Sequence, residues 1–208
     1  TGAQKRVWQE IQSDLAGETV MNRLVQGDVG SGKTVLALLA LLSAVESGFQ
    51  GAMMAPTEVL ARQHAESIRE LLLGLSMEDC VELLTGSMTA KEKRELKARL
   101  KSGEIDIVCG THAMLQGDVE IPDLSFIVCD EQHRFGVAQR NALAEKGEGA
   151  DMLVMSATPI PRTLSLIFYG DLDITTISDK PKERQEIATS IISASRYEDM
   201  LDYIGREV

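Results

Sequence analysis

The residues best suited to chemistry lie at 27–34, which read GDVGSGKT and match the pattern G-x-x-x-x-G-K-[ST]. Glycines in such a loop let backbone N–H groups wrap a phosphate, and the N-terminus of the following helix adds positive potential. Lys33 would reach the β and γ phosphates of a nucleoside triphosphate, and Thr34 would ligate magnesium. We therefore predict a phosphate-binding loop. Its candidate residues are Gly27, Asp28, Val29, Gly30, Ser31, Gly32, Lys33 and Thr34.

A second group of candidates ends the apolar segment at 126–131, which reads FIVCDE. Ligands of α/β proteins bind at the carboxyl ends of the strands, where Asp130 and Glu131 are expected to lie. Asp130 would hold magnesium through its water shell, and Glu131 would orient and deprotonate the water that attacks the γ-phosphate. Two acids ending a strand are common, but here they follow a phosphate loop by about a hundred residues. We predict ATP hydrolysis with Lys33, Asp130 and Glu131 as catalytic residues, and with Thr34 and Asp130 at the metal.

Two further strings, DEQH at 130–133 and SAT at 156–158, suggest what the hydrolysis drives. They resemble the second and third motifs of superfamily 2 helicases, D-E-x-H and S-A-T. The resemblance implies that Gln132 and His133 lie between the nucleotide and the pair Ser156 and Thr158. These four residues would relay the nucleotide state to a nucleic-acid site. A lone histidine or a lone Ser-Ala-Thr is more often structural, so the order and spacing of the two strings carry this interpretation.

Further strings along the chain point to one family among these helicases. The strings GDVGSGKT, GTH at 110–112, DEQHRFG at 130–136 and SATPIPRT at 156–163 resemble the RecG family of bacterial branched-DNA helicases. The Mfd family of transcription-repair coupling translocases shares the RFG and PIPRT strings. However, it usually has an aromatic residue in place of Ser31 and a glutamate in place of Gln132. Both positions favour RecG.

The resemblance implies the ATP-binding motor lobe of an ATP-dependent DNA helicase, with ATP and Mg²⁺ as cofactors and branched double-stranded DNA as partner. Forks and Holliday junctions in repair and recombination would be its substrates. An Mfd-like translocase remains an alternative. A non-motor P-loop ATP-binding protein, such as a kinase or an interaction module, is an alternative of another class, although SAT argues against a kinase.

The same resemblance assigns two more sets of residues. Gln4 matches the glutamine that reads adenine in the family. Strand-to-helix turns that grip the nucleic-acid backbone in relatives match Pro56, Thr57, Thr85, Gly86, Gly110, Thr111 and His112. Without the resemblance, Thr57 would be only a helix cap. Arg134 and Arg140 belong to a signature of the RecG and Mfd group, but their types would equally suit surface ion pairs.

The charge of the chain argues against nucleic-acid binding by bulk electrostatics, since Asp and Glu outnumber Lys and Arg by 32 to 21 and the net charge is −11. One basic stretch, residues 91–101, stands out. We interpret it as a solvated helix surface with i,i+4 ion pairs rather than as a binding patch. Helix N-termini and hydroxyl groups can hold phosphates without a net positive charge.

The elements that must position these residues alternate between short apolar segments and longer helical ones, which is typical of βαβ units. Mostly apolar strands are expected at 23–26, 52–55, 105–109, 126–129 and 152–155. Helices are expected at 33–47, 57–73 and from Thr89 to near 103, the first two closed by Gly48 and Gly74 and the last opened by a Thr89 and Glu92 capping box. The predicted fold is α/β, a RecA-like P-loop NTPase lobe whose parallel sheet has helices on both faces.

We place the first RecA-like lobe at 1–178 and a linker with the truncated start of a second lobe at 179–208, where a strand is expected at 187–192. An arginine finger, expected in the missing lobe, typically contributes about 10³ or more to the rate. The chain alone is therefore expected to be nearly inactive. Without a signal peptide or a membrane-length apolar segment, a cytoplasmic location is expected. The three cysteines should be reduced and buried, and the resemblance implies that the full-length protein is a monomer.

Overall fold

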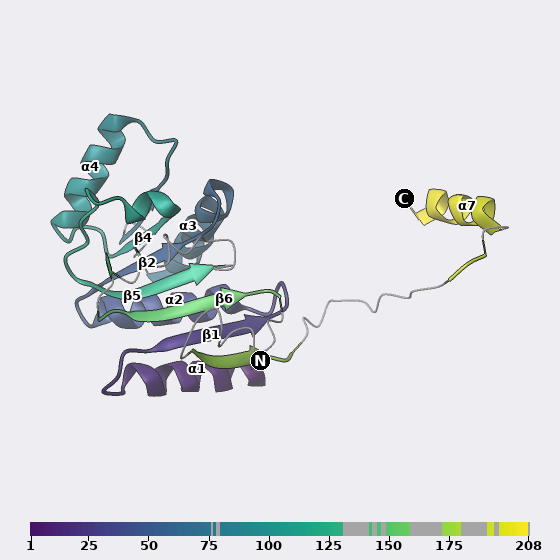
Figure 1. Cartoon of the computed structure of the whole chain (residues 1–208), viewed down its shortest axis with the longest axis horizontal. Helices are drawn as coiled ribbons and strands as arrows, with labels where there is room; N and C mark the ends of the chain where they lie inside the picture. The colour runs from purple at the N-terminus through teal and green to yellow at the C-terminus, as the bar shows by residue number, and fades with distance from the viewer. Residues whose placement is uncertain are drawn as a thin grey trace.

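The computed structural model describes residues 1–75, 77, 80–130, 142, 145–146, 149–158, 172–179, 191–193 and 196–207. Its centre is a seven-stranded sheet with the order β3-β4-β2-β5-β6-β1-β7, and every pair of neighbouring strands is parallel. The strands are β1 (Asn22–Gly27), β2 (Gln50–Met54), β3 (Val81–Leu84), β4 (Ile107–Gly110), β5 (Leu124–Asp130), β6 (Asp151–Ser156) and β7 (Asp173–Ile177). Because the pairing is parallel, the carboxyl ends of all these strands meet at one edge (Figure 1).

Four helices cover the two faces of the sheet: α1 (Gly2–Leu15), α2 (Lys33–Glu46), α3 (Glu58–Leu72) and α4 (Ala90–Lys101). The structure also has the 3-10 turns η1 (Leu73–Leu75) and η3 (His112–Leu115), and helix α7 (Tyr197–Glu207) after the last strand. Local capping fixes where the helices begin: Thr57 accepts the Leu60 N–H at the start of α3. Thr89 and Glu92 form the expected capping box of α4.

The central strands of the sheet are apolar on both faces, because each face packs against a separate core. Val25, Met53 and Val128 lie in one core with buried residues of α1, α2 and α3. Their neighbours Leu24, Ala52 and Ile127 lie in the other core with Leu96 and Leu100 of α4 and with Met114 of η3. Strands buried on both faces read as apolar runs without alternation. The predicted fold class is confirmed.

The five strands expected between residues 23 and 155 are present, but β3, β7 and helix α1 were not predicted. The end of α3 also differs from the expectation, because Gly74 is absent from the glycines with a left-handed backbone and lies instead in the 3-10 turn η1. Gly48 and Gly103 do adopt positive φ after α2 and α4, at 84° and 75°. Most of the strand expected at 187–192 lies outside the described residues, and its last two residues, Ile191 and Ile192, are not in a strand.

The basic stretch at 91–101 is an ion-paired helix surface, as expected. Lys91 pairs with Glu95 one turn away, at 3.9 Å. The later cations of α4 reach acids of other segments, including Lys97 to Asp118 at 2.5 Å. Its charges are thus largely balanced within the molecule, and the helix offers no concentrated positive field.

The three cysteines are free thiols, of which Cys109 and Cys129 are buried and Cys80 is half-buried. Burial raises the pKa of both buried thiols to about 12. These two thiols are therefore protonated and unreactive at neutral pH.

Helix α7 is drawn apart from the sheet (Figure 1). Within the described ranges, no helix has the length and apolar character needed to cross a membrane.

Candidate nucleotide site and nucleic-acid interface

The sequence motifs divide the carboxyl edge of the sheet into two halves. The adjacent strands β5, β6 and β1 end at Asp130, Ser156 and the phosphate loop, and we call this part the nucleotide half. The adjacent strands β3, β4 and β2 lead to Thr85, Thr111 and Thr57, and we call this part the outer half. Residues that are far apart in the sequence but share a predicted function thus lie in the same half of the edge. The two halves meet where β5 pairs with β2.

The phosphate loop joins β1 to α2 in a conformation that depends on glycine. Gly30 and Gly32 have φ values of 78° and 87°, and Gly32 is the N-cap of α2. L-residues other than glycine rarely adopt this backbone. Lys33 begins the helix and turns its ammonium group back into the loop, where Nζ donates to the carbonyls of Gly27 at 2.6 Å and Asp28 at 3.0 Å. The loop thereby places a cation and a helix N-terminus at one point, which suits a triphosphate.

Ser31 and Gln4 complete the loop. The Gln4 Nε2 group donates to the Ser31 carbonyl at 2.8 Å, so the expected adenine-reading residue lies against the phosphate loop. The Ser31 hydroxyl is buried without a hydrogen-bond partner in the described part of the chain. A side chain at Gly27 would come within 2.6 Å of that hydroxyl. A buried, unpaired hydroxyl in a glycine-rich cradle fits a phosphate oxygen as its partner. Thr34 follows Lys33 in the first turn of α2 and is half-buried.

Asp130 ends β5 at the centre of the sheet and makes a contact that the sequence motifs did not predict. Its Oδ2 lies 2.8 Å from Nε2 of His64 in helix α3. The two side chains are only 13% and 12% exposed. No local signal marked His64, because its partner is 66 positions away and meets it only through the order of the strands. Glu131, the expected general base, lies outside the described residues.

The coupling residues are placed only in part. Ser156 is the last residue of β6, is 1% exposed and lies beside Gln26 of β1. Its hydroxyl accepts the Thr158 N–H at 3.2 Å and lies 3.1 Å from the Thr158 hydroxyl. The SAT string therefore forms a tight turn next to the phosphate loop. Gln132 and His133, with Arg134 and Arg140, lie outside the described residues.

The outer half brings together all seven residues assigned to nucleic acid, but with different exposure. Thr57, Gly86 and His112 are exposed, whereas Pro56 is half-buried and Gly110, Thr85 and Thr111 are buried. The Thr111 hydroxyl accepts the Ala113 N–H at 3.4 Å, and that of Thr85 lies 3.1 Å from the Ser87 hydroxyl. These two hydroxyls shape their own turns. The exposed residues and backbone N–H groups are therefore the better candidates for phosphate contacts.

Glu58 of the outer half makes a contact with Ser87 that the sequence did not predict. Its carboxylate accepts the Ser87 N–H at 3.0 Å and the Ser87 hydroxyl at 2.5 Å. The hydrogen bond from the Ser87 hydroxyl is the main reason that the pKa of Glu58 is lowered. Glu58 directly follows Thr57, and Ser87 directly follows Gly86. The contact therefore links two turns of the outer half.

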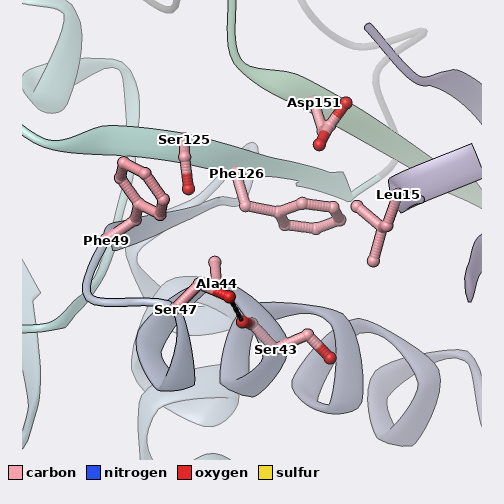
Figure 2. Close-up of a pocket in the computed structure, with 8 residues that line it drawn as sticks. All are labelled: Leu15, Ser43, Ala44, Ser47, Phe49, Ser125, Phe126 and Asp151. Carbon is pink, nitrogen blue, oxygen red and sulfur yellow. Dashed lines mark hydrogen bonds between the residues drawn. The ribbon is translucent and has the colours of Figure 1, made fainter. Parts of the chain in front are cut away.

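A separate cavity lies at the opposite, amino edge of the sheet. Figure 2 shows it between Phe49, Phe126, the end of α2 and Asp151. Its volume of about 210 Å³ is below the roughly 300–1,000 Å³ of usual small-molecule sites. Asp151 accepts the Met21 N–H there at 2.7 Å, and burial is the main reason that its pKa is raised. None of the motif residues lines this cavity.

Comparison with known proteins shows the family of the chain. Residues 1–167 match the model of the DEAD/DEAH box helicase family. The chain is 50% identical over 208 residues to the ATP-dependent DNA helicase RecG of Thermotoga maritima, a match that covers all of this chain and 26% of that protein. It is 47% identical over 208 residues to RecG of Bacillus subtilis, covering all of this chain and 30% of that relative.

Solved structures of helicases are also similar to this chain. The structure of RecG bound to a three-way DNA junction matches all of this chain and 27% of that chain, with a TM-score of 0.83 and 46% identity. The helicase domain of Hef from Pyrococcus furiosus matches 85% of this chain and 38% of that chain at 24% identity and a TM-score of 0.62, which shows a shared fold. The chain thus spans between a quarter and a third of the RecG proteins that it matches.

Proposed function

Since the chain belongs to the DEAD/DEAH box helicase family and resembles RecG over its whole length, we propose that it is the ATP-binding motor lobe of an ATP-dependent helicase that remodels branched DNA. Forks and Holliday junctions would be its substrates, in repair and recombination. The observation that carries the proposal is the divided sheet edge. It sets a phosphate loop and a carboxylate beside a row of turns suited to a nucleic-acid backbone.

ATP and Mg²⁺ are the proposed cofactors. Lys33 and the loop residues from Gly27 to Thr34 would bind the phosphates, with Gln4 at the adenine. Thr34 and Asp130 would hold Mg²⁺, which supplies charge stabilisation for the phosphate groups. Glu131 would orient the attacking water and accept its proton. Gln132, His133, Ser156 and Thr158 would transmit the nucleotide state, since Ser156 lies between the strand of the loop and the strand of Asp130.

DNA is the proposed partner of the outer half. The structure of RecG named above holds a three-way junction, and this supports branched DNA as the substrate class. Phosphate contacts would come from Thr57, Gly86 and His112 and from backbone N–H groups at Thr85, Gly110 and Thr111, which suits an acidic lobe. Pro56 has no N–H group and would lie beside the backbone at the start of its turn. Residues 1–178 would form the first lobe and 179–208 a linker with the start of a second. The full-length protein would act as a monomer in the cytoplasm.

The RecG relatives support this proposal over the Mfd-like alternative, and the helicase family supports it over a non-motor P-loop protein. The test uses the full-length protein and a fluorescent three-way junction, and measures strand separation with ATP or with a non-hydrolysable analogue. We expect separation only with ATP, its loss in Lys33→Ala, and very little activity from the 208-residue chain alone.

Lys146→Ala is the matched control for this test. Like Lys33, Lys146 donates to two backbone carbonyls, those of Gln116 at 3.0 Å and Val119 at 2.5 Å, but it lies outside the proposed site. We expect this variant to separate the junction as the wild type does. Equal strand separation with the analogue, or full activity in Lys33→Ala, would refute the proposed motor function.

A further inference from the structure

His64 connects the two halves of the sheet edge. It lies in α3, the helix that follows β2, and its Nε2 is 2.8 Å from Oδ2 of Asp130 at the end of the neighbouring strand β5. Both side chains are nearly buried, at 12% and 13% exposure. A hydrogen bond so shielded from water is better maintained than a surface contact. The arrangement fixes the orientation of the carboxylate relative to α3.

We propose that His64 is a positioning residue that holds the Asp130 carboxylate in the orientation required by the magnesium–nucleotide complex. This inference rests on the proposed function, in which Asp130 is the magnesium acid. Carboxylates that hold metals are themselves usually hydrogen-bonded, and losing such a partner typically lowers metal affinity or activity by about 10–100-fold. His64 is the partner that the described residues offer to Asp130.

The place of His64 in its helix also matters. Thr57 caps the N-terminus of α3 and belongs to the outer half. His64 follows seven residues later, about 10 Å along the axis at ~1.5 Å per residue. Since α3 packs through Ala61, Ala65 and Ile68, which are all fully buried, it behaves as one rigid element. One helix therefore carries both a proposed DNA contact and the hydrogen-bond partner of the magnesium acid.

The test uses the full-length protein with His64→Ala, His64→Gln and the control Glu66→Ala, which removes an exposed side chain from the same helix. Two quantities are measured: the Mg²⁺ concentration for half-maximal ATPase rate, and the affinity for a fluorescent ADP analogue in Mg²⁺ and in EDTA. For His64→Ala we expect the half-saturating Mg²⁺ concentration to rise about 10–100-fold. Nucleotide affinity should fall in Mg²⁺ but stay unchanged in EDTA.

The Gln variant separates positioning from packing, because its amide N–H can donate to Asp130 as the imidazole does. In His64→Gln we expect the half-saturating Mg²⁺ concentration to return most of the way to the wild-type value. In Glu66→Ala we expect the wild-type value. An unchanged Mg²⁺ requirement in His64→Ala would overturn the proposal. So would equal losses of affinity in Mg²⁺ and in EDTA that His64→Gln fails to restore, since that pattern indicates a structural role.

Failure of this proposal is distinguishable from failure of the proposed function. The ADP-binding measurement needs no DNA, so it reports on His64 whether or not DNA stimulates the enzyme. If Lys33→Ala retains full DNA-stimulated ATPase, the proposed function fails whatever the His64 variants show. If His64→Ala does not fold, as judged by thermal melting, His64→Gln carries the test. Wild-type Mg²⁺ dependence then supports the proposal, and a large shift overturns it.

Discussion

Gly32 meets two separate requirements of the phosphate loop. Its φ of 87° lies in the left-handed region, and a side chain there would collide with the Gln4 amide group. A residue other than glycine typically costs about 1–2 kcal/mol in this backbone region. The Gln4 side chain would have to move away, which would break its hydrogen bond to the Ser31 carbonyl. Backbone strain and lost ligand contacts should therefore be separable by mutation.

We predict that Gly32→Ala weakens binding of a fluorescent ATP analogue by tenfold or more, because the strained backbone and the displaced Gln4 side chain would each lose ligand contacts of roughly 1 kcal/mol. Gly48→Ala is the matched control at the other end of α2, with a similar φ of 84° and no atom within 4 Å of the added carbon. Both variants should lose about 1 kcal/mol of unfolding free energy in urea. Equal nucleotide affinity in the two variants would contradict this account of the loop.

The sequence predicted some site residues and missed others for a physical reason. The loop from Gly27 to Thr34 functions through neighbours in the chain, so its spacing alone reveals it. His64 and Glu58 act on partners 66 and 29 positions away. Their roles depend on strand order and on the approach of two turns, which a local pattern does not contain.

At the scale of elements, Arg23 of β1 ties helix α1 to strand β7. It is 9% exposed and bonds to Asp14 and Glu10 of α1 and to Thr175 of β7. Burial alone would lower the pKa of Arg23, but the Asp14 hydrogen bond and the charges of Asp14, Asp173 and Glu10 leave it raised. This cluster fixes α1, the helix that presents Gln4, to the edge of the sheet.

We predict that Arg23→Met lowers the unfolding free energy by about 2–3 kcal/mol in urea denaturation. Breaking a fully buried ion pair typically costs about 3–5 kcal/mol, and the carboxylates here are partly exposed. Lys91→Met is the control, since its side chain is 76% exposed and lies 3.9 Å from Glu95 in the same helix. A change below about 1 kcal/mol is expected for that variant. If the two substitutions lowered the free energy of unfolding equally, the Arg23 cluster would stabilise the fold no more than a surface ion pair does.

Apolar patterning predicted the central strands but not the outer ones. Strands β1, β2, β4, β5 and β6 are buried on both faces, so they read as apolar runs. The outermost strands β3 and β7 are partly exposed and contain Glu82, Asp173 and two threonines. Helix α1 buries only Val7 and Ile11, which leaves little apolar signal.

At the scale of the whole molecule, one parallel sheet aligns two different sites. The phosphate loop, Asp130 and Ser156 end neighbouring strands, and the proposed DNA turns follow the next three. The fold class was predictable because the strand and helix segments alternate. The boundary between the two halves of the sheet edge could not be predicted from the sequence, because it depends on the order of the strands. This arrangement would put the proposed nucleotide and DNA sites on the same edge of the sheet, so that one could act on the other in an ATP-driven motor.

The most direct test of this account is the ATPase rate of the full-length protein with and without branched DNA, for the wild type and for Glu131→Gln. The account predicts strong stimulation by branched DNA in the wild type. In the variant the stimulated rate should fall by on the order of 10²–10⁴, because the general base is lost, while ATP binding is retained. No stimulation by any DNA, or a variant as fast as the wild type, would contradict the account.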